Sequence, residues 1–141
     1  MGQIKIGILS ALVLLLGSCN EPTRESNTMV YENMLVRIAK IELLPGHFEE
    51  YLDLLREEAS ASMELEAGVI CIYPMYEKDN PSMIRLLEIY ADREAYESHL
   101  KTPHFLKYKN GTLHMIKSLE LLDMEAIDPQ TMPAIFSKLA P

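Results

Sequence analysis

The feature that most constrains the fold is a pair of strand-like apolar stretches joined by a short run of turn-forming residues. The stretches are residues 69–76 (VICIYPMY) and 83–90 (MIRLLEIY), and the connection between them is EKDNPS. Valine, isoleucine and tyrosine are typical of strands, whereas asparagine, aspartate, proline and serine are typical of turns. The sequence therefore predicts a β-hairpin in the middle of the chain.

Two further elements are expected before the hairpin. Residues 34–43 (MLVRIAKIEL) alternate apolar and polar side chains, which indicates a strand that ends before Pro45-Gly46. From His47 to near Gly68, apolar residues recur at three- and four-residue steps with acidic residues between them. This spacing predicts an amphipathic helix whose apolar stripe comprises Phe48, Leu52, Leu55, Ala59 and Met63.

Two helices, a strand and a tail are expected after the hairpin. Asp92 is a suitable N-cap for a helix over 93–101, and Thr102-Pro103 begins a second helix that Asn110-Gly111 ends. Residues 119–127 (LELLDMEAI) form the last strand, and the tail 128–141 has room for one helical turn or two. The order β-α-β-β-α-β predicts an α+β, ferredoxin-like fold, a four-stranded antiparallel sheet with helices on one face.

The hairpin also predicts a partner for the sheet, because its strands are apolar on both faces. Alternation puts Val69, Cys71 and Met75 on one face of their strand and Ile70 and Ile72 on the other. A sheet with two apolar faces needs a layer on each, and the predicted helices cover only one. We expect a homodimer in which a second copy covers the open face. The alternative is that tail 128–141 covers this face within one monomer.

The N-terminal residues have the pattern of a signal peptide. Lys5 precedes an apolar run from Ile6 to Leu16, which at about 11 residues is shorter than the roughly 20 that a membrane-spanning helix needs. The run ends in Leu16-Gly17-Ser18-Cys19, which resembles a bacterial lipobox. We therefore expect residues 1–18 to be a lipoprotein signal peptide and residues 19–33 a tether lipidated at Cys19. An ordinary secretory signal with an incidental cysteine is the alternative.

The lipobox implies a protein of the cell envelope, anchored to a bacterial membrane on the extracytoplasmic side. With Cys19 lipidated, only Cys71 remains, so the mature chain has no partner cysteine for an intrachain disulfide. Cys71 lies in an apolar stretch, where a free cysteine usually behaves as a small buried hydrophobic residue. The formal net charge of −8 argues against nucleic acid as a partner.

Four short motifs follow one another in the second half of the chain. They are Glu66-Ala67-Gly68 before the second strand, Glu88-Ile89-Tyr90 at a strand end, His99-Leu100 at a helix end, and the turn Thr102-Pro103-His104-Phe105. With this set, residues 34–127 resemble the antibiotic biosynthesis monooxygenase (ABM) family, whose members typically show E-x-G, E-x-W/Y, H-L and T/S-P-H-F at these places. The resemblance implies a ferredoxin-like domain that pairs with a second copy as a dimeric α/β barrel, and an enzyme that works without a cofactor.

Within the family, the chain is most similar to quinol monooxygenases and to small isomerases of a phosphorylated signalling molecule, which share H-x-x-T-P-H segments. A haem-degrading branch uses an asparagine, a tryptophan and a histidine. This chain has no tryptophan, Tyr90 stands where that residue falls, and Lys109 lies about where the histidine is expected. Only Asn33 remains as a match, so haem degradation is disfavoured.

The resemblance points to His99 and His104 as candidate catalytic bases. A phenol and a histidine differ by about 3.5 pKa units, roughly 4.8 kcal/mol, so a histidine alone is an inadequate base for a hydroquinone. Groups that stabilise the anion must close this gap. The candidate substrate-binding residues are Asn33, Arg37, Tyr73, Glu88 and Tyr90, and Arg85 and Tyr76 are further donors.

Each candidate also has a structural interpretation. His99 lies on an apolar helical face and is equally compatible with a hydrogen-bonded core histidine, and His104 with a residue that packs the turn. Glu88 either orients a base or forms an ion pair with Arg37 or Arg85, and the ion pair is the favoured interpretation. No metal site is expected, because Pro103 interrupts the helix between the two histidines and no third ligand is evident nearby.

The leading hypothesis is a homodimeric, lipid-anchored monooxygenase that consumes molecular oxygen. Its substrate is a small aromatic quinol-like or polyketide-like compound, bound between the sheet and the helices. One rival is a cofactor-free isomerase of a small carbonyl compound, which consumes no oxygen. The other is a non-catalytic dimeric lipoprotein that binds a small ligand, and a pocket without a histidine favours it.

Overall fold

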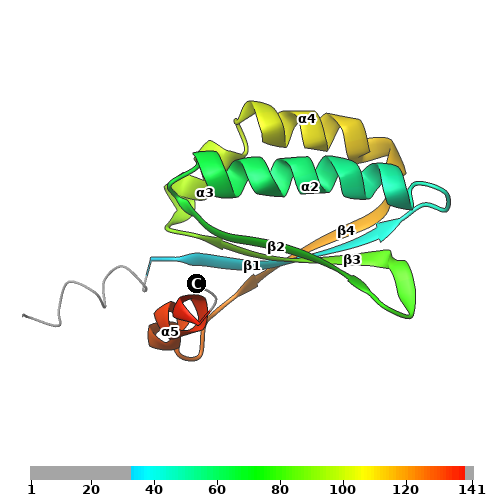
Figure 1. Cartoon of the computed structure of the whole chain (residues 1–141). Coiled ribbons are helices and arrows are strands. Elements are labelled where there is room, and N and C mark those ends of the chain that lie inside the picture. Colours follow the sequence, from blue (N-terminus) through cyan, green and yellow to red (C-terminus); the bar gives the residue numbers. More distant parts are fainter. Residues whose placement is uncertain (1–32, 139–141) are drawn as a thin grey trace, which may run out of the picture.

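A computed structural model describes residues 33–138, and the predicted signal peptide and almost all of the predicted lipidated tether lie outside the described residues. The elements follow the order β-α-β-β-α-α-β, with short 3-10 turns and a C-terminal helix (Figure 1). They are β1 (Leu35–Leu43), α2 (Phe48–Leu65), β2 (Val69–Glu77), β3 (Asn80–Tyr90), α3 (Arg93–His99), α4 (Pro103–Thr112), η1 (Leu113–Met115), β4 (Ile116–Met124), η2 (Pro129–Thr131) and α5 (Met132–Ser137).

The four strands form one antiparallel sheet in the order β2-β3-β1-β4, which confirms the ferredoxin-like prediction. β1 lies in the interior of the sheet, where Ala39 pairs with Leu86 of β3 on one side and with Leu121 of β4 on the other. Helices α2 and α4 lie together over one face of this sheet (Figure 1). In the described part of the chain, no helix is long and apolar enough to cross a membrane.

The main core lies between the sheet and α2. Tyr51 and Leu55 of α2 are almost fully buried, as are Ile84 of β3 and Met115 of η1. The buried stripe of α2 is rotated from the predicted one, because Met63 is 46% exposed and Glu58 and Ser62 are buried instead. Two polar side chains therefore lie on the face that α2 turns toward the sheet.

The predicted helix N-caps are present. The Asp92 carboxylate accepts a hydrogen bond from the backbone N–H of Ala95 (2.7 Å) at the start of α3. Thr102 Oγ1 accepts one from the N–H of Phe105 (3.3 Å) at the start of α4, where Pro103 is the first residue. These caps satisfy N–H groups that a helix leaves unpaired, and they hold two short helices at a fixed break.

A register shift between Val69 and Cys71 changes the expected faces of β2. Val69 pairs with Tyr90 and Ile72 pairs with Glu88, on the helix-covered face. Cys71 pairs with Ile89, and both lie outside the helix-side core. The prediction that Val69 and Cys71 share a face is therefore wrong, because an extra residue in one strand reverses the alternation beyond it.

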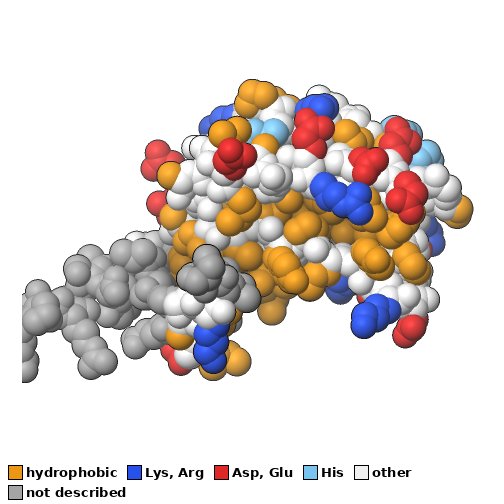
Figure 2. Space-filling view, in the orientation of Figure 1, with side chains coloured by type: hydrophobic (Ala, Val, Ile, Leu, Met, Phe, Trp, Pro, Cys, Tyr) orange, Lys and Arg blue, Asp and Glu red, His pale blue; other side chains and the backbone are white. Residues whose placement is uncertain are grey.

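The face of the sheet opposite the helices is largely apolar, and we call it the open face. Helix α5 lies on this side, near one end of the sheet (Figure 1). Tyr73 and Met75 of β2 lie on this face and are 60% and 40% exposed. Figure 2 shows hydrophobic side chains gathered below the helix layer, whereas charged side chains are more frequent above it. The apolar residues of the open face are Val36, Ile38, Cys71, Tyr73, Met75, Leu87, Ile89, Leu122 and Met124.

Gly68 permits a close approach between the start of β2 and α3, so we expect Gly68→Ala to destabilise the fold. An added Cβ would lie 2.5 Å from the Cβ of Ala95, a contact that only a backbone shift relieves. The expected loss is about 1–3 kcal/mol in the free energy of unfolding, measured by urea denaturation. Gly111→Ala is the control, because its Cβ meets only the end of the Leu54 side chain at 3.2 Å. Equal stabilities for the two variants would contradict this account.

Candidate active site

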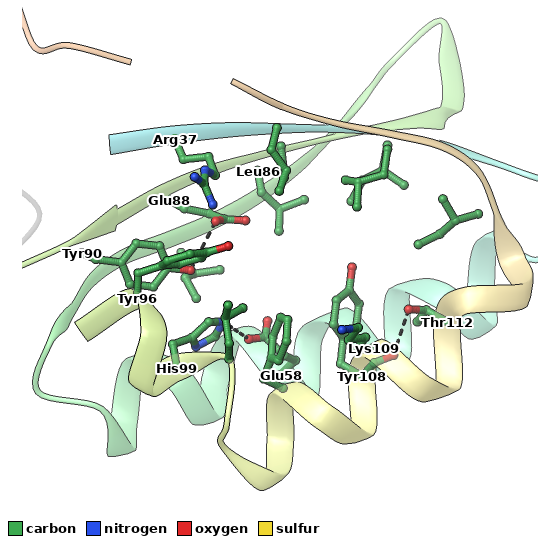
Figure 3. A pocket seen from close by; sticks show the side chains of 18 of the residues that line it. Arg37, Glu58, Leu86, Glu88, Tyr90, Tyr96, His99, Tyr108, Lys109 and Thr112 are labelled. Carbon is green, nitrogen blue, oxygen red and sulfur yellow. Dashed lines mark hydrogen bonds and ion pairs between the residues drawn. The ribbon is translucent and has the colours of Figure 1, made fainter. Parts of the chain in front are cut away.

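A pocket of about 300 Å³ opens between the helix-covered face of the sheet and helices α3 and α4 (Figure 3). It exists because the helices leave β4 at the edge of the sheet partly uncovered, so that Leu119 and Leu121 are 54% and 46% exposed. The small side chain of Ala39 lies in the floor. Most of the lining is aliphatic or aromatic, and a few ionisable side chains enter it, which is typical of a small-molecule site.

His99 enters this pocket from the end of α3 and is only 3% exposed. Its Nδ1 atom lies 3.0 Å from Oε1 of Glu66, which precedes β2. Its Nε2 atom lies 3.6 Å from Oε1 of Glu58 on α2. Because a carboxylate accepts a hydrogen bond, Glu66 favours the tautomer with the proton on Nδ1. The lone pair of Nε2 is then directed to the Glu58 side, where Figure 3 shows His99 beside Glu58.

His104 contacts the same Glu66 carboxylate but is not among the residues that line the pocket. Its Nε2 atom lies 2.6 Å from Oε1 of Glu66. Burial opposes ionisation of Glu66, but the hydrogen bonds from His104 and His99 outweigh it and lower the pKa of this carboxyl. Glu66 is therefore a stable anion that both histidines share, and it links the pocket histidine to a less buried one.

The same three residues have ligand atoms within 4.8 Å of one another, a spacing compatible with a metal ion. The expectation that no third ligand lies near the two histidines is wrong, because Glu66 comes from a distant part of the chain. The shared hydrogen bonds to Glu66 already account for the clustering. His47, Glu50 and His114 form a similar, more exposed group near the start of α2.

Glu58 is a pocket residue that the sequence analysis did not identify. Its side chain is 4% exposed, lines the pocket, and accepts a hydrogen bond from Ser62 Oγ (2.8 Å). Burial raises the pKa of Glu58, although the bond from Ser62 and the neighbouring histidines act in the opposite direction. The available signal was its position three residues after Leu55 on the apolar face of α2, where an acidic residue is unusual.

We expect Glu58→Gln to stabilise the protein in a pH-dependent manner. A carboxyl whose pKa is raised by folding binds its proton more tightly in the native state, so stability falls as pH rises above the unfolded value of about 4.3. Glutamine cannot ionise and keeps an acceptor for Ser62. The stability gain over the parent should be absent near pH 4 and present at pH 7, measured by urea unfolding. The exposed neighbour Glu57→Gln is the control, and parallel pH curves for parent and Glu58→Gln would refute the prediction.

The opposite wall holds Arg37 of β1 and Glu88 of β3, which are paired across the two strands. Arg37 binds Asp123 through Nε and Nη2 (2.7 and 2.6 Å), and Arg85 binds Glu77 (2.6 Å). The favoured prediction of an ion pair between Glu88 and either arginine is therefore wrong. The strand register places Arg37 beside Asp123 and Arg85 beside Glu77 instead.

Glu88 lines the pocket and forms no ion pair with either arginine in the described part of the chain. It accepts a hydrogen bond from the Tyr90 hydroxyl at 3.2 Å (Figure 3). Burial raises the pKa of Glu88 despite that bond. The two acids on the pocket wall, Glu58 and Glu88, are therefore biased toward their neutral forms, in which each can donate a hydrogen bond.

Tyrosines complete the polar lining. The hydroxyl groups of Tyr51 and Tyr108 are hydrogen-bonded to each other (2.5 Å), and Tyr108 lines the pocket from α4. Burial raises the pKa of Tyr108 to about 12, so this phenol stays protonated at neutral pH. When Tyr51 donates to Tyr108, the Tyr108 proton is free to bind an oxygen atom in the pocket.

The structure brings together four of the predicted site residues and separates the other three. Arg37, Glu88, Tyr90 and His99 line one pocket, together with Tyr96 and Leu100. His104 lies one hydrogen bond behind it. Asn33 lies in an exposed turn before β1, outside the pocket lining. Tyr73 pairs with Leu87 on the open face, so the expectation that it contacts substrate with the others is wrong.

A ferredoxin-like sheet with a buried histidine at the wall of a largely apolar pocket provides a concave site between the sheet and the helices that is suited to a small molecule. The sequence profile described as antibiotic biosynthesis monooxygenase matches residues 34–111. The chain therefore belongs to this family. A comparison of its sequence with curated proteins found no match.

Solved structures agree with the family assignment. A Bacteroides thetaiotaomicron protein named for the same family is 48% identical, with a TM-score of 0.69 over 70% of this chain and 94% of its own. A Lactobacillus acidophilus protein named as a monooxygenase is 31% identical, with a TM-score of 0.65 over 66% of this chain and 44% of its own. A Pseudomonas aeruginosa protein is 25% identical, with a TM-score of 0.63 over 68% of this chain and 96% of its own.

Proposed function

We propose that this ABM-family protein is a cofactor-independent monooxygenase of a small aromatic quinol-like compound. The observation that carries the proposal is the His99–Glu66 pair, in which a partly buried carboxylate orients a buried histidine at the wall of a largely apolar pocket. Such a pair supplies a base for a phenolic proton, and the apolar lining excludes water from the anion that results.

The reaction balances without a bound redox group. A hydroquinone and one oxygen molecule give a hydroxyquinone and one water molecule, so the substrate supplies all four electrons that the oxygen molecule accepts. One oxygen atom enters a ring C–H position and the other leaves as water. His99 Nε2 accepts the phenolic proton, and Glu66 stabilises the imidazolium that forms.

Stabilisation of the phenolate closes the pKa gap between a phenol and a histidine. The Tyr108 hydroxyl is a donor inside the pocket, and the Glu58 and Glu88 carboxyls, whose pKa values burial raises, also donate when they are protonated. The low dielectric of the pocket strengthens such hydrogen bonds to an anion. The gap of roughly 4.8 kcal/mol requires two or three charge-assisted hydrogen bonds of about 1.5–3 kcal/mol each. The pocket contains that number of donors.

We also propose that the protein is a homodimer that buries the open face. Ile38 and Leu87 lie near the middle of this face on the two inner strands, and Tyr73 and Met75 extend the apolar surface across β2. Helix α5 lies near one end only, so the alternative in which the tail covers the whole face has less support (Figure 1). An apolar face of this kind is typical of an interface between copies.

The envelope location stays a proposal drawn from the leader sequence, whose residues lie outside the described part of the chain. Lipidation of Cys19 would hold the domain on a short tether at the membrane surface. Cys19→Ala is expected to abolish lipid attachment and to release the protein from the membrane fraction if the leader is cut elsewhere. Fractionation with metabolic labelling by a radioactive fatty acid checks this, and labelling that persists in the variant would refute it.

The experiment that tests the proposed activity is oxygen uptake by residues 28–141 against a panel of hydroquinones, in the presence of a chelator and without flavin. Uptake that depends on both protein and substrate supports the oxygenase. No uptake across the panel would move the proposal to the isomerase or the ligand-binding protein, with the fold unaffected.

A further inference from the structure

Arg37 has an unused donor at the pocket wall. The residue is 7% exposed, and its Nε and Nη2 atoms are both held by Asp123. Its Cζ atom lies 4.5 Å from the centre of the Tyr96 ring, which fixes the plane of the guanidinium from one side. The remaining nitrogen, Nη1, is buried and has no hydrogen-bond partner within residues 33–138.

A buried, unpaired donor on a charged group is costly, and such groups in native proteins usually have a partner. Arg37 is one of the residues that line the pocket, so a ligand bound there is the candidate partner for this nitrogen. Asp123 balances its charge only in part, because that carboxylate is 59% exposed and the ion pair is weakened by solvent screening. The site therefore favours an acceptor with negative charge over a neutral carbonyl oxygen.

Glu88 provides a second donor at the same place. Figure 3 shows the ends of the Arg37 and Glu88 side chains close together on the sheet wall, whereas His99 and Tyr108 approach from the helices. Burial favours the neutral Glu88 carboxyl, and one of its oxygens is occupied by Tyr90. Arg37 Nη1 and a protonated Glu88 can each donate to one oxygen of a planar anion.

A cluster of aromatic side chains lines the pocket between the sheet and the helices, which favours an aromatic ring in the ligand. Tyr90 lies 5.3 Å from Tyr96 and 5.4 Å from His99 between ring centres, and Phe105 lies 4.7 Å from His99. We propose that the ligand is an aromatic carboxylic acid whose carboxylate binds Arg37 Nη1 and Glu88, with its phenolic oxygen toward His99. This inference rests on the proposed function, whose substrate class it narrows from quinols to quinol acids.

The test is calorimetric binding of 2,5-dihydroxybenzoate and of its neutral isostere, 2,5-dihydroxybenzamide, without oxygen so that no turnover occurs. We expect the acid to bind about ten- to hundredfold more tightly than the amide, the range of one charge-assisted hydrogen bond. Arg37→Gln should abolish this preference, and Arg37→Lys should retain part of it. Lys109→Gln, which removes the other cation of the pocket lining, should leave the preference intact.

Equal affinity of the parent protein for acid and amide would overturn the proposal, and this comparison needs no variant. A preference that is lost in Lys109→Gln but kept in a folded Arg37→Gln would also overturn it, because the carboxylate would then bind at the other cation. The binding experiment tests the Arg37 subsite and the oxygen-uptake experiment tests the proposed activity, so the two proposals can be refuted independently. Acid preference without oxygen uptake refutes the oxygenase alone, and oxygen uptake with neutral hydroquinones but no acid preference refutes the Arg37 subsite alone.

Discussion

Replacing His99 with alanine is expected to lower the rate of substrate-dependent oxygen uptake by about 10²–10⁴-fold, the usual contribution of a positioned general base. The reason is geometric. Among the residues that the structure describes, His99 is the one histidine that lines the pocket. Glu66 holds its Nδ1 proton, so the lone pair of Nε2, on the side of Glu58, can accept a proton from substrate. The measurement is initial rate with an oxygen electrode, with thermal unfolding monitored to confirm that the variant is folded.

Two further histidines make the comparison specific. His104→Ala should reduce the rate less than His99→Ala, because His104 reaches the pocket only through the shared Glu66 carboxylate. His114→Ala should have the parent rate, because that residue is exposed and belongs to a separate cluster. A His99→Ala protein that is folded and retains a rate within a few-fold of the parent would remove His99 as the base.

Placing a lysine at Leu87 is expected to raise the dissociation constant of the proposed dimer by at least about 100-fold. Leu87 lies on the open face of β3, opposite Ile38 of β1. In a two-fold symmetric interface each substitution occurs twice, and an unpaired ammonium in an apolar interface costs several kcal/mol. Sedimentation velocity at micromolar concentration should show dimer for the parent protein and monomer for Leu87→Lys.

Leu65→Lys is the matched control for this prediction. Leu65 is also a leucine and is 70% exposed, but it ends α2 on the helix side of the sheet. The same new charge at that position should leave the dimer unchanged. A parent protein that sediments as a monomer, or a Leu87→Lys variant that dimerises as tightly as the parent, would contradict the assignment of the open face as the interface.

The fold was predictable because local signals agreed with the final arrangement. The alternation in β1, the Asp92 and Thr102 caps and the turn residues of the hairpin each determine structure over a few positions. Some element boundaries differ from the prediction by a few residues. β4 begins at Ile116, three residues before the predicted start at 119, and the helix expected to end at Gly111 continues to Thr112.

The site was less predictable because its contacts join residues that are far apart in the sequence. Glu66 meets His99 across 33 positions and Arg37 meets Asp123 across 86, and neither pairing is determined by local spacing. The ion pair expected for Glu88 failed for this reason. The prediction of Tyr73 as a pocket donor failed because the face of a strand residue depends on the strand register. In β2 this register places Tyr73 opposite Leu87 on the open face. Glu58 alone had a local signal, an acid on an apolar helical face.

The most direct test of the central claim is to run the reaction under ¹⁸O₂ in ordinary water, with flavin-free protein in the presence of a chelator. The mass of the product is measured by mass spectrometry immediately after quenching. We predict a hydroxyquinone that contains one ¹⁸O atom, with the second ¹⁸O atom recovered in water, and formation of the same product at least about 100-fold more slowly by His99→Ala. An unlabelled quinone accompanied by labelled hydrogen peroxide would contradict the account, because the protein would then transfer electrons to oxygen without inserting an oxygen atom into the substrate.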